Sequence, residues 1–294
     1  MPLEPVTELM RKAREGRYAV GYFESWNLES LQGVVDAAEQ SRSPVILGFN
    51  GDFLSRPGRR AAERVTWYAE LGRAAARSSA VPCGLIFNEC PNDDWVRRAA
   101  AVGFNLIMPS DPSASREEYV RRVQALTRHA HPLGVAVEAE VGELPSGSDA
   151  AGGKTTDPED AARFVAETGV DLLAVSVGNV HIRLEGEQPL DLARLEAIHR
   201  AVDCPLVLHG GTGIEAGSLR EAIRLGVAKV NYGTYLKQRY LRAMRDALAG
   251  GEANPHELLG IGGPADVMVA GRLAVRDAVL ERIENLGCCG RAGE

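Results

Sequence analysis

The strongest constraint on the fold of this chain is a repeated alternation of short apolar strands with amphipathic helices. Each strand-like run is followed by a segment with apolar residues at three- and four-residue spacing, and several of these segments end in glycine. Strict alternation of this kind predicts an α/β protein with parallel strands and crossover helices. The eight runs are YAVGYF (18–23), PVILGF (44–49), PCGLIF (82–87), NLIMP (105–109), GVAVEAE (134–140), LLAVSV (172–177), PLVLH (205–209) and AKVNY (228–232).

Eight strand–helix units favour a closed barrel, because a (β/α)8 TIM barrel typically takes about 250 residues. A doubly wound sheet is the alternative, but it often has fewer strands and a nucleotide fingerprint, and no GxGxxG follows YAVGYF. Residues 250–294 continue past the eighth strand with NPHELLG and VAGRLAVRDAVLERIENLG. We predict a C-terminal helical extension here, packed on the barrel or on a partner subunit, within one domain of residues 1–294.

Composition excludes several classes of protein. The chain has 294 residues, 45% of them hydrophobic and 25% charged, which is typical of a globular protein with a large core. Its net charge of −7 and its scattered basic residues argue against a nucleic-acid partner. The sequence contains neither a signal-peptide pattern nor an apolar run of membrane-spanning length, so we expect a cytoplasmic protein without a membrane partner. Its five cysteines lack CxxC pairs, and we expect free thiols.

Polar side chains stand at the ends of the predicted strands. Because the chemistry of a barrel lies at the carboxyl ends of its strands, they are expected to converge on one rim. His181 and His209 are at such ends, and with Glu89 they form a candidate metal site of two histidines and one carboxylate, the alternative being structural histidines. The full set is Glu24, Asn50, Asp52, Asn88, Glu89, Ser110, Asp111, Glu138, Glu140, Asn179, His181, His209 and Asn231.

Two glycine-containing loops follow the last two predicted strands. HGGTG (209–213) follows the seventh and NYGT (231–234) the eighth, and loops at these positions often hold a phosphate in barrels. A tight turn is the alternative interpretation of HGGTG. The long segment GELPSGSDAAGGKTTDP (142–158) is interpreted as a lid or, alternatively, as a surface loop without a function.

Over nearly its whole length the chain resembles the class II, metal-dependent fructose- and tagatose-bisphosphate aldolases. The similar segments are YAVGYF, NLESLQGVVDAAEQSRSPVILG, GVAVEAEVG, TDPEDAARFVAETGVDLLAVSVGNVH, PLVLHGGTGI and LGVAKVNYGTYL. The resemblance implies a carbon–carbon lyase that reversibly cleaves a phosphorylated ketose, or a close analogue, through a metal-stabilised enediolate. It also implies a divalent metal, with Zn²⁺ favoured over Fe²⁺ or Mn²⁺. From the C-terminal extension we expect a homodimer or homotetramer.

The resemblance implies roles for individual residues. The histidines of the family's GxVH and LHGG(S/T)G motifs hold the metal, and they match His181 and His209. Phosphate and the dihydroxyacetone part of the ketose are held by residues that match Asn27, Gly178, Gly210, Gly211, Thr212, Gly213, Asn231, Gly233 and Thr234.

The chain departs from the family at the third strand. Where the family has His-x-Asp-His-Gly, this chain has IFNEC, so that Ile86, Asn88, Glu89 and Cys90 replace the first His, the Asp, the ligand His and the Gly. An amide cannot act as the general base that the Asp provides. Glu89 is expected to be either the third ligand, which would favour iron or manganese, or a base. The other candidates for the base are Glu24, Asp111, Glu140 and Asp149.

Further departures are Ile182, Glu185, Gly147 and Ser148, which stand where the family has the Gly and Lys of a VHGxYK stretch and mobile-loop glutamates. Two functions other than an aldolase therefore stay open. The chain is either a homologue that binds a sugar phosphate without turnover, or a metal-dependent enzyme for a different reaction.

Overall fold

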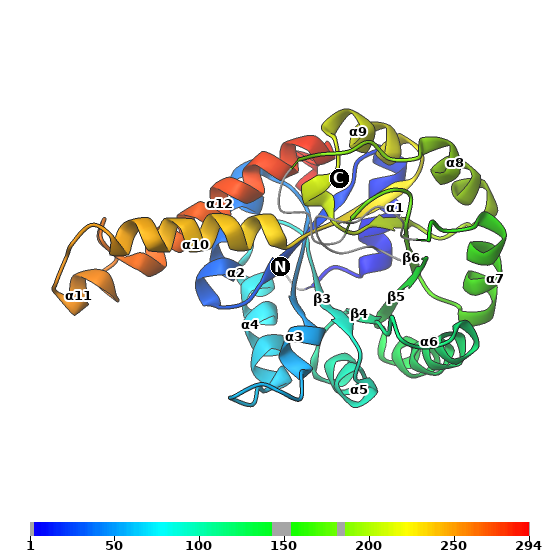
Figure 1. Ribbon diagram of the computed structural model, residues 1–294, viewed down its shortest axis with the longest axis horizontal. Coiled ribbons are helices and arrows are strands. Elements are labelled where there is room, and N and C mark those ends of the chain that lie inside the picture. Colours follow the sequence, from blue (N-terminus) through cyan, green and yellow to red (C-terminus); the bar gives the residue numbers. More distant parts are fainter. Residues whose placement is uncertain (1–2, 143–153, 181–185, 294) are drawn as a thin grey trace.

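Eight parallel strands close into one barrel, which confirms the predicted TIM barrel. The computed structural model describes residues 3–142, 154–180 and 186–293. Each strand pairs with the next along the chain, and the last pairs with the first (Figure 1). The strands are β1 (Val20–Ser25), β2 (Val45–Asn50), β3 (Cys83–Cys90), β4 (Leu106–Pro109), β5 (Ala136–Val141), β6 (Leu172–Val175), β7 (Leu206–Leu208) and β8 (Val227–Tyr232).

Helices cover the outside of the barrel and alternate with its strands. The α-helices are α1 (Val6–Gly16), α2 (Leu28–Ser41), α3 (Gly51–Ser55), α4 (Val65–Ser78), α5 (Asp93–Val102), α6 (Arg116–Ala130), α7 (Pro158–Thr168), α8 (Leu192–Ala201), α9 (Ala216–Arg224), α10 (Thr234–Leu248), α11 (Pro255–Leu258) and α12 (Val267–Leu286). Short 3-10 turns are η1 (His131–Leu133), η2 (Gly211–Gly213) and η3 (Arg291–Gly293).

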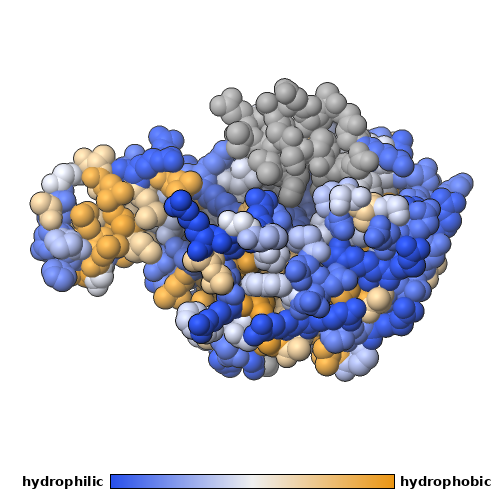
Figure 2. All heavy atoms as spheres, turned by 60° about the horizontal axis from the view of Figure 1, so that its bottom comes forward, coloured by the Kyte–Doolittle hydropathy of each residue, from blue (hydrophilic) through white to orange (hydrophobic). Residues whose placement is uncertain are grey.

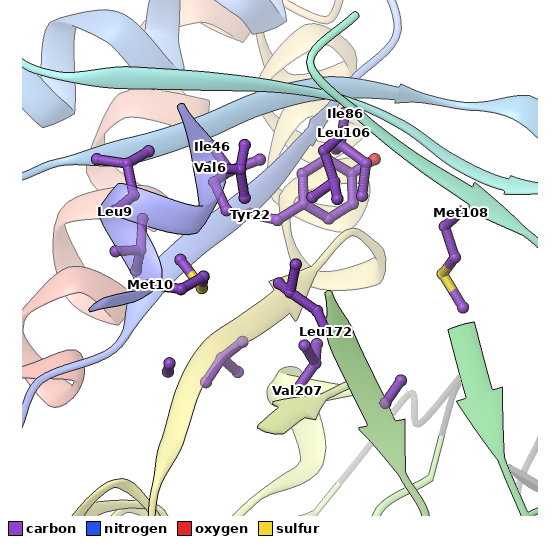
Figure 3. Packing of buried hydrophobic residues seen from close by; sticks show 14 of the residues in the cluster. Val6, Leu9, Met10, Tyr22, Ile46, Ile86, Leu106, Met108, Leu172 and Val207 are labelled. Carbon is purple, nitrogen blue, oxygen red and sulfur yellow. The ribbon is translucent and has the colours of Figure 1, made fainter. Parts of the chain in front are cut away.

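Helix α1 closes the amino-terminal end of the barrel. It buries Val6, Leu9, Met10 and Ala13, and the first three lie near barrel residues such as Ile46 (Figure 3). The lower part of the interior is therefore filled with apolar side chains, as in other TIM barrels. The polar residues at the carboxyl ends of the strands lie at the opposite end of the barrel.

The predicted C-terminal helices are present, and α12 packs against α2 and α10. Gly33 allows this close approach, because a Cβ at this position would lie 2.6 Å from the carbonyl oxygen of Arg272. A bidentate pair between Arg272 and Asp36, at 2.6 and 2.8 Å, joins the same two helices. The end of α10, α11 and the start of α12, residues 241–273, project beyond the barrel as an arm (Figure 1).

Hydrophobic side chains gather on the projecting arm (Figure 2). Its exposed members are Leu241, Leu248, Leu259, Ile261 and Leu273, which are 40% to 59% exposed. Within the described ranges, no helix has both the length and the apolar character needed to cross a membrane.

Candidate active site

The candidate active site is a cleft at the carboxyl ends of the strands. Nine residues that the sequence placed at the site line it together: Glu24, Asn50, Asn88, Glu89, Gly210, Thr212, Asn231, Gly233 and Thr234. Four further residues complete the wall: Tyr22, Phe53, Tyr232 and Lys237. Glu24, Asn50, Asn88, Glu89 and Asn231 belong to the strands themselves, whereas the sequence placed the first four just after the strands.

Glu89 has an unusual backbone for a strand residue. Its φ is +54°, and the pairing of β3 with β4 shifts register between Phe87 and Cys90. The other non-glycine residues with positive φ in the described chain, Arg17 and Arg42, are helix C-caps. A bulge with one residue in the left-handed region redirects a side chain. Here the redirected side chain is the carboxylate that faces His209.

His209 lies at the centre of a group of carboxylates. Its Nε2 is 2.9 Å from Oε1 of Glu138, and its Nδ1 is 2.9 Å from Oε1 of Glu89 and 3.8 Å from Oε2 of Glu140. Burial disfavours the charged imidazole, but Glu138 and Glu89 outweigh it and raise the pKa of His209 to about 10. The two carboxylates therefore favour the imidazolium form of the ring.

A buried lysine lies below this group inside the barrel. Lys229 has no exposed surface, and its Nζ is 2.8 Å from Oε2 of Glu138 and 2.5 Å from Oδ1 of Asn231. Its ammonium also lies 5.2 Å from the ring centroid of Tyr22. Burial lowers the pKa of Lys229 despite the nearby Glu138. For Glu138, burial acts to raise the pKa, but Lys229 and His209 outweigh it and the pKa is lowered.

Three buried polar atoms of the cleft residues have no hydrogen-bond partner among the described residues. They are Oη of Tyr22, Oδ1 of Asn88 and Nδ2 of Asn231. Buried polar groups are nearly always paired in folded proteins, so atoms of this kind in a cleft indicate where a polar ligand or water binds. Together they offer a hydroxyl, an acceptor and a donor.

The glycine loop and the start of α10 form the opposite wall. Gly210 has φ +67°, which leads the chain into the turn η2, and Gly211 packs so closely on Tyr232 that a Cβ would lie 2.6 Å from its ring. Gly233 and Thr234 form the first turn of α10, a helix of 15 residues. The amino-terminal end of such a helix carries free N–H groups and partial positive charge, which favour an anion.

Lys237, a cationic side chain that lines the cleft, forms an ion pair with Glu24. Nζ of Lys237 lies 2.5 Å from Oε1 of Glu24 and 4.4 Å from the ring centroid of Phe53. Glu24 fits against Gly233, where an added Cβ would be 2.4 Å from its Oε2. The carboxylate therefore fixes Lys237 beside the first turn of α10.

The donors around His209 fit a divalent metal by their chemistry. Two carboxylates, from Glu89 and Glu140, lie within 4 Å of the imidazole nitrogen Nδ1. No group of three His, Cys, Asp or Glu side chains is arranged to hold an ion within the described ranges, which leave out residues 181–185. In the structure, Nδ1 of His209 contacts Oε1 of Glu89 directly, at 2.9 Å.

Several residues assigned from the sequence have other partners in the structure or lie outside it. His181 and Asp149, like Gly147, Ser148, Ile182 and Glu185, are outside the described residues. Asp111 accepts hydrogen bonds from Ser113 and pairs with Arg122 at 3.8 Å. Asn27 caps α2 and donates to Oη of Tyr240 at 2.8 Å. Gly178, Gly211 and Gly213 are not among the residues that line the cleft, and the carbonyl oxygen of Gly178 accepts a hydrogen bond from Gln188.

A second cavity, larger than this cleft, lies at the other end of the barrel. It has a volume of about 540 Å³ and is lined by arginines near the last turns of α1 and α9. These turns carry the negative ends of helix dipoles, which basic side chains commonly neutralise. Arg11 is also paired with Glu8 and Glu15. The arginines are thus explained by local electrostatics, and the cleft at the carboxyl end is the candidate site.

Five residues of the site were not found from the sequence: Tyr22, Phe53, Lys229, Tyr232 and Lys237. Lys229 had a detectable signal, because a lone lysine in the apolar run AKVNY, predicted to be a barrel strand, must be buried or paired. Tyr22 and Lys237 had none, since a tyrosine in a strand and a lysine on a helix are ordinary.

Together, the closed barrel and a rim of carboxylates, imidazole and glycine loops at the carboxyl ends of the strands are typical of a TIM-barrel enzyme. The comparison with family models is specific: the model for "Fructose-bisphosphate aldolase class-II" matches residues 4–291. The chain belongs to this family. Members of the family generally depend on a divalent metal, and membership supports an aldol-type lyase activity for this chain.

Individual relatives agree with this membership. The fructose-bisphosphate aldolase of Geobacillus stearothermophilus is 32% identical over 297 residues, covering 100% of both chains. The crystal structure of the YdjI aldolase from Escherichia coli K12 matches with a TM-score of 0.83 and 30% identity, over 99% of this chain and 100% of that one. A putative fructose-1,6-bisphosphate aldolase from Coccidioides immitis matches with a TM-score of 0.82 and 28% identity, over 98% of both chains.

Proposed function

We propose that this chain is a metal-dependent aldolase that reversibly cleaves a phosphorylated ketose or a close analogue. The observation that carries the proposal is one cleft lined by Glu89, which contacts the buried imidazole of His209, and also by the glycine loop after β7 and the first turn of α10. The names of relatives, such as the Geobacillus fructose-bisphosphate aldolase, support a ketose bisphosphate as the first substrate to test.

The phosphate is proposed to bind between the loop 210–213 and the first turn of α10. Gly210, Thr212, Gly233 and Thr234 line this wall of the cleft. Backbone N–H groups approach an anion closely where glycines remove side chains, and the helix dipole adds attraction. Gly211 and Gly213 keep the turn compact, and Asn27 and Gly178 stay predicted contributors from the family pattern.

Glu89 and His209 are proposed to hold the metal, with His181 as the further ligand that the family pattern implies. Nδ1 of His209 and Oε1 of Glu89 face each other at 2.9 Å, and Nδ2 of Asn50 donates to Oε2 of Glu89 at 2.9 Å and orients it. When bound, a divalent ion supplies Lewis-acid polarisation of the ketose carbonyl. Zn²⁺ is proposed first, and a carboxylate among the ligands also suits Fe²⁺ or Mn²⁺.

The proton of the cleavage step is proposed to be taken by Glu140 or by Asp149. Asn88 offers an acceptor oxygen to a substrate hydroxyl but cannot take its proton. Glu24 is held by Lys237, and Asp111 by Ser113 and Arg122. Glu140 is the other described carboxylate beside Nδ1 of His209, so Glu140→Gln should lower turnover while metal content is kept.

The proposal is tested with purified, metal-loaded protein and fructose 1,6-bisphosphate or tagatose 1,6-bisphosphate. Release of triose phosphate that stops when a chelator removes the metal would support it. Glu89→Gln should lose bound metal, and Glu140→Gln is the matched control that removes a neighbouring carboxylate. Metal-loaded protein that releases no triose phosphate from either substrate would contradict the bisphosphate aldolase version.

A second candidate function is binding without turnover, or a different metal-dependent reaction. Asn88 favours it, because the residue aimed into the cleft where the family has its Asp carries no titratable group. This candidate predicts that a ketose phosphate binds in calorimetry without product. Replacing Asn88→Asp together with Glu89→His should then create aldolase activity, and oxygen consumption with iron would indicate a redox reaction instead.

The arm is proposed to pack on a second copy of this chain, giving a homodimer or homotetramer. Five of the ten exposed large hydrophobic residues among those described lie on its 33 residues, which is the pattern expected of an interface. Replacing Leu248 and Ile261 by Lys should reduce the mass measured by light scattering. Leu133→Lys is the control, because Leu133 is 50% exposed but lies away from the arm.

The whole chain is proposed to be one domain. The proposal is supported by the packing of α12 against the rest of the protein. This helix buries Val275, Ala278, Val279, Ile283 and Leu286. Limited proteolysis should therefore release no stable fragment that contains the barrel without α12.

A further inference from the structure

We propose that Lys229 is a positioning residue that orients both halves of the active site. Through Glu138 it fixes which nitrogen of His209 faces the metal ligands, and through Asn231 it turns an amide N–H group toward the substrate. The inference rests on the proposed function and adds to it a residue that contacts neither metal nor substrate. It also specifies the kind of atom that the substrate presents to Asn231.

The contacts of Lys229 account for its burial. It comes from β8, and its ammonium reaches across the interior of the barrel to Glu138 on β5, at 2.8 Å. Asn231, two residues further along β8, receives a second hydrogen bond, at 2.5 Å. The ring of Tyr22 covers the ammonium at 5.2 Å from its centroid. Lys229 and Glu138 are both 0% exposed, so each charge depends on the other.

The contact with Asn231 decides how its amide is oriented. An ammonium group can only donate hydrogen bonds, so the amide must present its oxygen to Lys229. Nδ2 then points away from Lys229, and it is buried at the cleft with no partner among the described residues. A group bound there must accept a hydrogen bond. The structure therefore assigns a carbonyl, alkoxide or phosphate oxygen of the substrate to this position.

The contact with Glu138 decides the state of His209. A carboxylate paired with Lys229 accepts hydrogen bonds only, so Nε2 of His209 must carry its hydrogen toward Glu138. The lone pair of a neutral ring is then on Nδ1, the nitrogen that faces Glu89 and Glu140. A carboxylate behind a ligating histidine fixes the tautomer and the ring orientation in many metal sites.

A purely stabilising role explains the arrangement less well. A buried ion pair often gives no net stability over apolar residues of the same shape, because removing two charges from water is costly. Apolar residues such as Ile46, Ile86 and Leu106 fill the nearby interior (Figure 3). An apolar residue at 229 would have filled the same space, but it would hold neither Glu138 nor Asn231.

The test compares three variants with the whole protein. Binding of Mn²⁺ is measured by calorimetry, and binding of dihydroxyacetone phosphate is then measured at saturating Mn²⁺. Lys229→Met should weaken Mn²⁺ binding about 10- to 100-fold, as loss of a supporting contact behind a ligand does. It should also weaken dihydroxyacetone phosphate binding. Glu138→Gln should weaken Mn²⁺ binding, whereas Asn231→Ala should weaken only dihydroxyacetone phosphate binding.

Failure of this inference differs from failure of the proposed function. Wild-type protein that binds neither probe would overturn the proposed function. Wild-type protein that binds both, with Lys229→Met binding both equally well, would overturn the role of Lys229. Leu9→Ala is the control for lost stability, because Leu9 is buried at the far end of the barrel and its loss should change neither affinity.

A second variant covers the case in which Lys229→Met does not fold. Lys229→Met combined with Glu138→Gln removes both buried charges and should restore folding. The double variant lacks the hydrogen bond from Lys229 to Asn231. It should therefore bind dihydroxyacetone phosphate more weakly than Glu138→Gln alone. Equal affinities of these two variants would overturn the inference.

Discussion

The backbone of Glu89 leads to a prediction about stability at the active site. A non-glycine residue in the left-handed region costs about 1–2 kcal/mol, and Glu89 has φ +54° within β3. Glu89→Ala and Glu89→Gly both remove the carboxylate and its contacts with His209 and Asn50. The two variants therefore differ in whether a Cβ is present on the strained backbone.

We expect Glu89→Gly to be more stable than Glu89→Ala, which is the reverse of the order expected at an ordinary strand position. Glycine normally destabilises a strand by about 0.5–1 kcal/mol relative to alanine because its unfolded chain is more flexible. Subtracting this cost from about 1–2 kcal/mol of relieved strain, taken at the midpoints of the two ranges, leaves Glu89→Gly more stable than Glu89→Ala by roughly 0.75 kcal/mol.

The assay is urea unfolding of the metal-free variants, followed by circular dichroism. Cys83 provides the matched control, because it is buried in the same strand without a positive φ. There Cys83→Ala should be more stable than Cys83→Gly. If Glu89→Ala equals or exceeds Glu89→Gly in stability, the left-handed conformation stores no strain and the reasoning is wrong.

Three further predictions concern the arm, the cleft and the metal. Asp266 caps α12 and accepts from the N–H groups of Gly260 and Met268, so Asp266→Ala should cost about 2 kcal/mol in urea unfolding. Burial opposes ionisation of Asp266, but these N–H groups outweigh it and lower the pKa of the carboxyl group. The stability that Asp266 contributes is therefore present above its pKa in the unfolded chain and is lost as the pH falls through its lowered pKa in the folded protein. Wild-type protein and Asp266→Ala should thus become equally stable in acid. Gly233→Ala should displace Glu24, whose Oε2 would lie 2.4 Å from the new Cβ, and weaken sugar-phosphate binding in calorimetry with little change in melting temperature. Adding Mn²⁺ at 100 times its dissociation constant should stabilise chelator-treated protein by about 2.7 kcal/mol, and no shift would contradict metal binding.

The fold could be predicted from the sequence because each strand and helix carries its own local pattern. Every predicted apolar run overlaps a strand of the barrel, since buried parallel strands are continuously apolar and their helices have a different period. The boundaries were less exact. The third strand extends through Asn88 and Glu89 to Cys90, because polar residues at a barrel's open end still complete the hydrogen-bond ladder.

The site was predictable in composition but not in its contacts. Asn88, Glu89 and Asn231 were found because strand ends converge on one rim. The pairing of Lys229 with Glu138 joins residues 91 positions apart on strands that are not neighbours, so no local pattern contains it. Asn27 was assigned to substrate, yet the spacing of Asn27 and Ser30 also fits a helix cap, and this is how the structure uses it.

The ion pair between Lys229 and Glu138 also has a consequence for folding kinetics. It joins β8 to β5 across the interior, so it can form only after the strands between them have assembled and water has left the barrel. Contacts that form after the transition state affect the unfolding rate more than the folding rate. Its main kinetic effect should therefore be to keep a finished barrel closed, which prolongs the lifetime of the native protein.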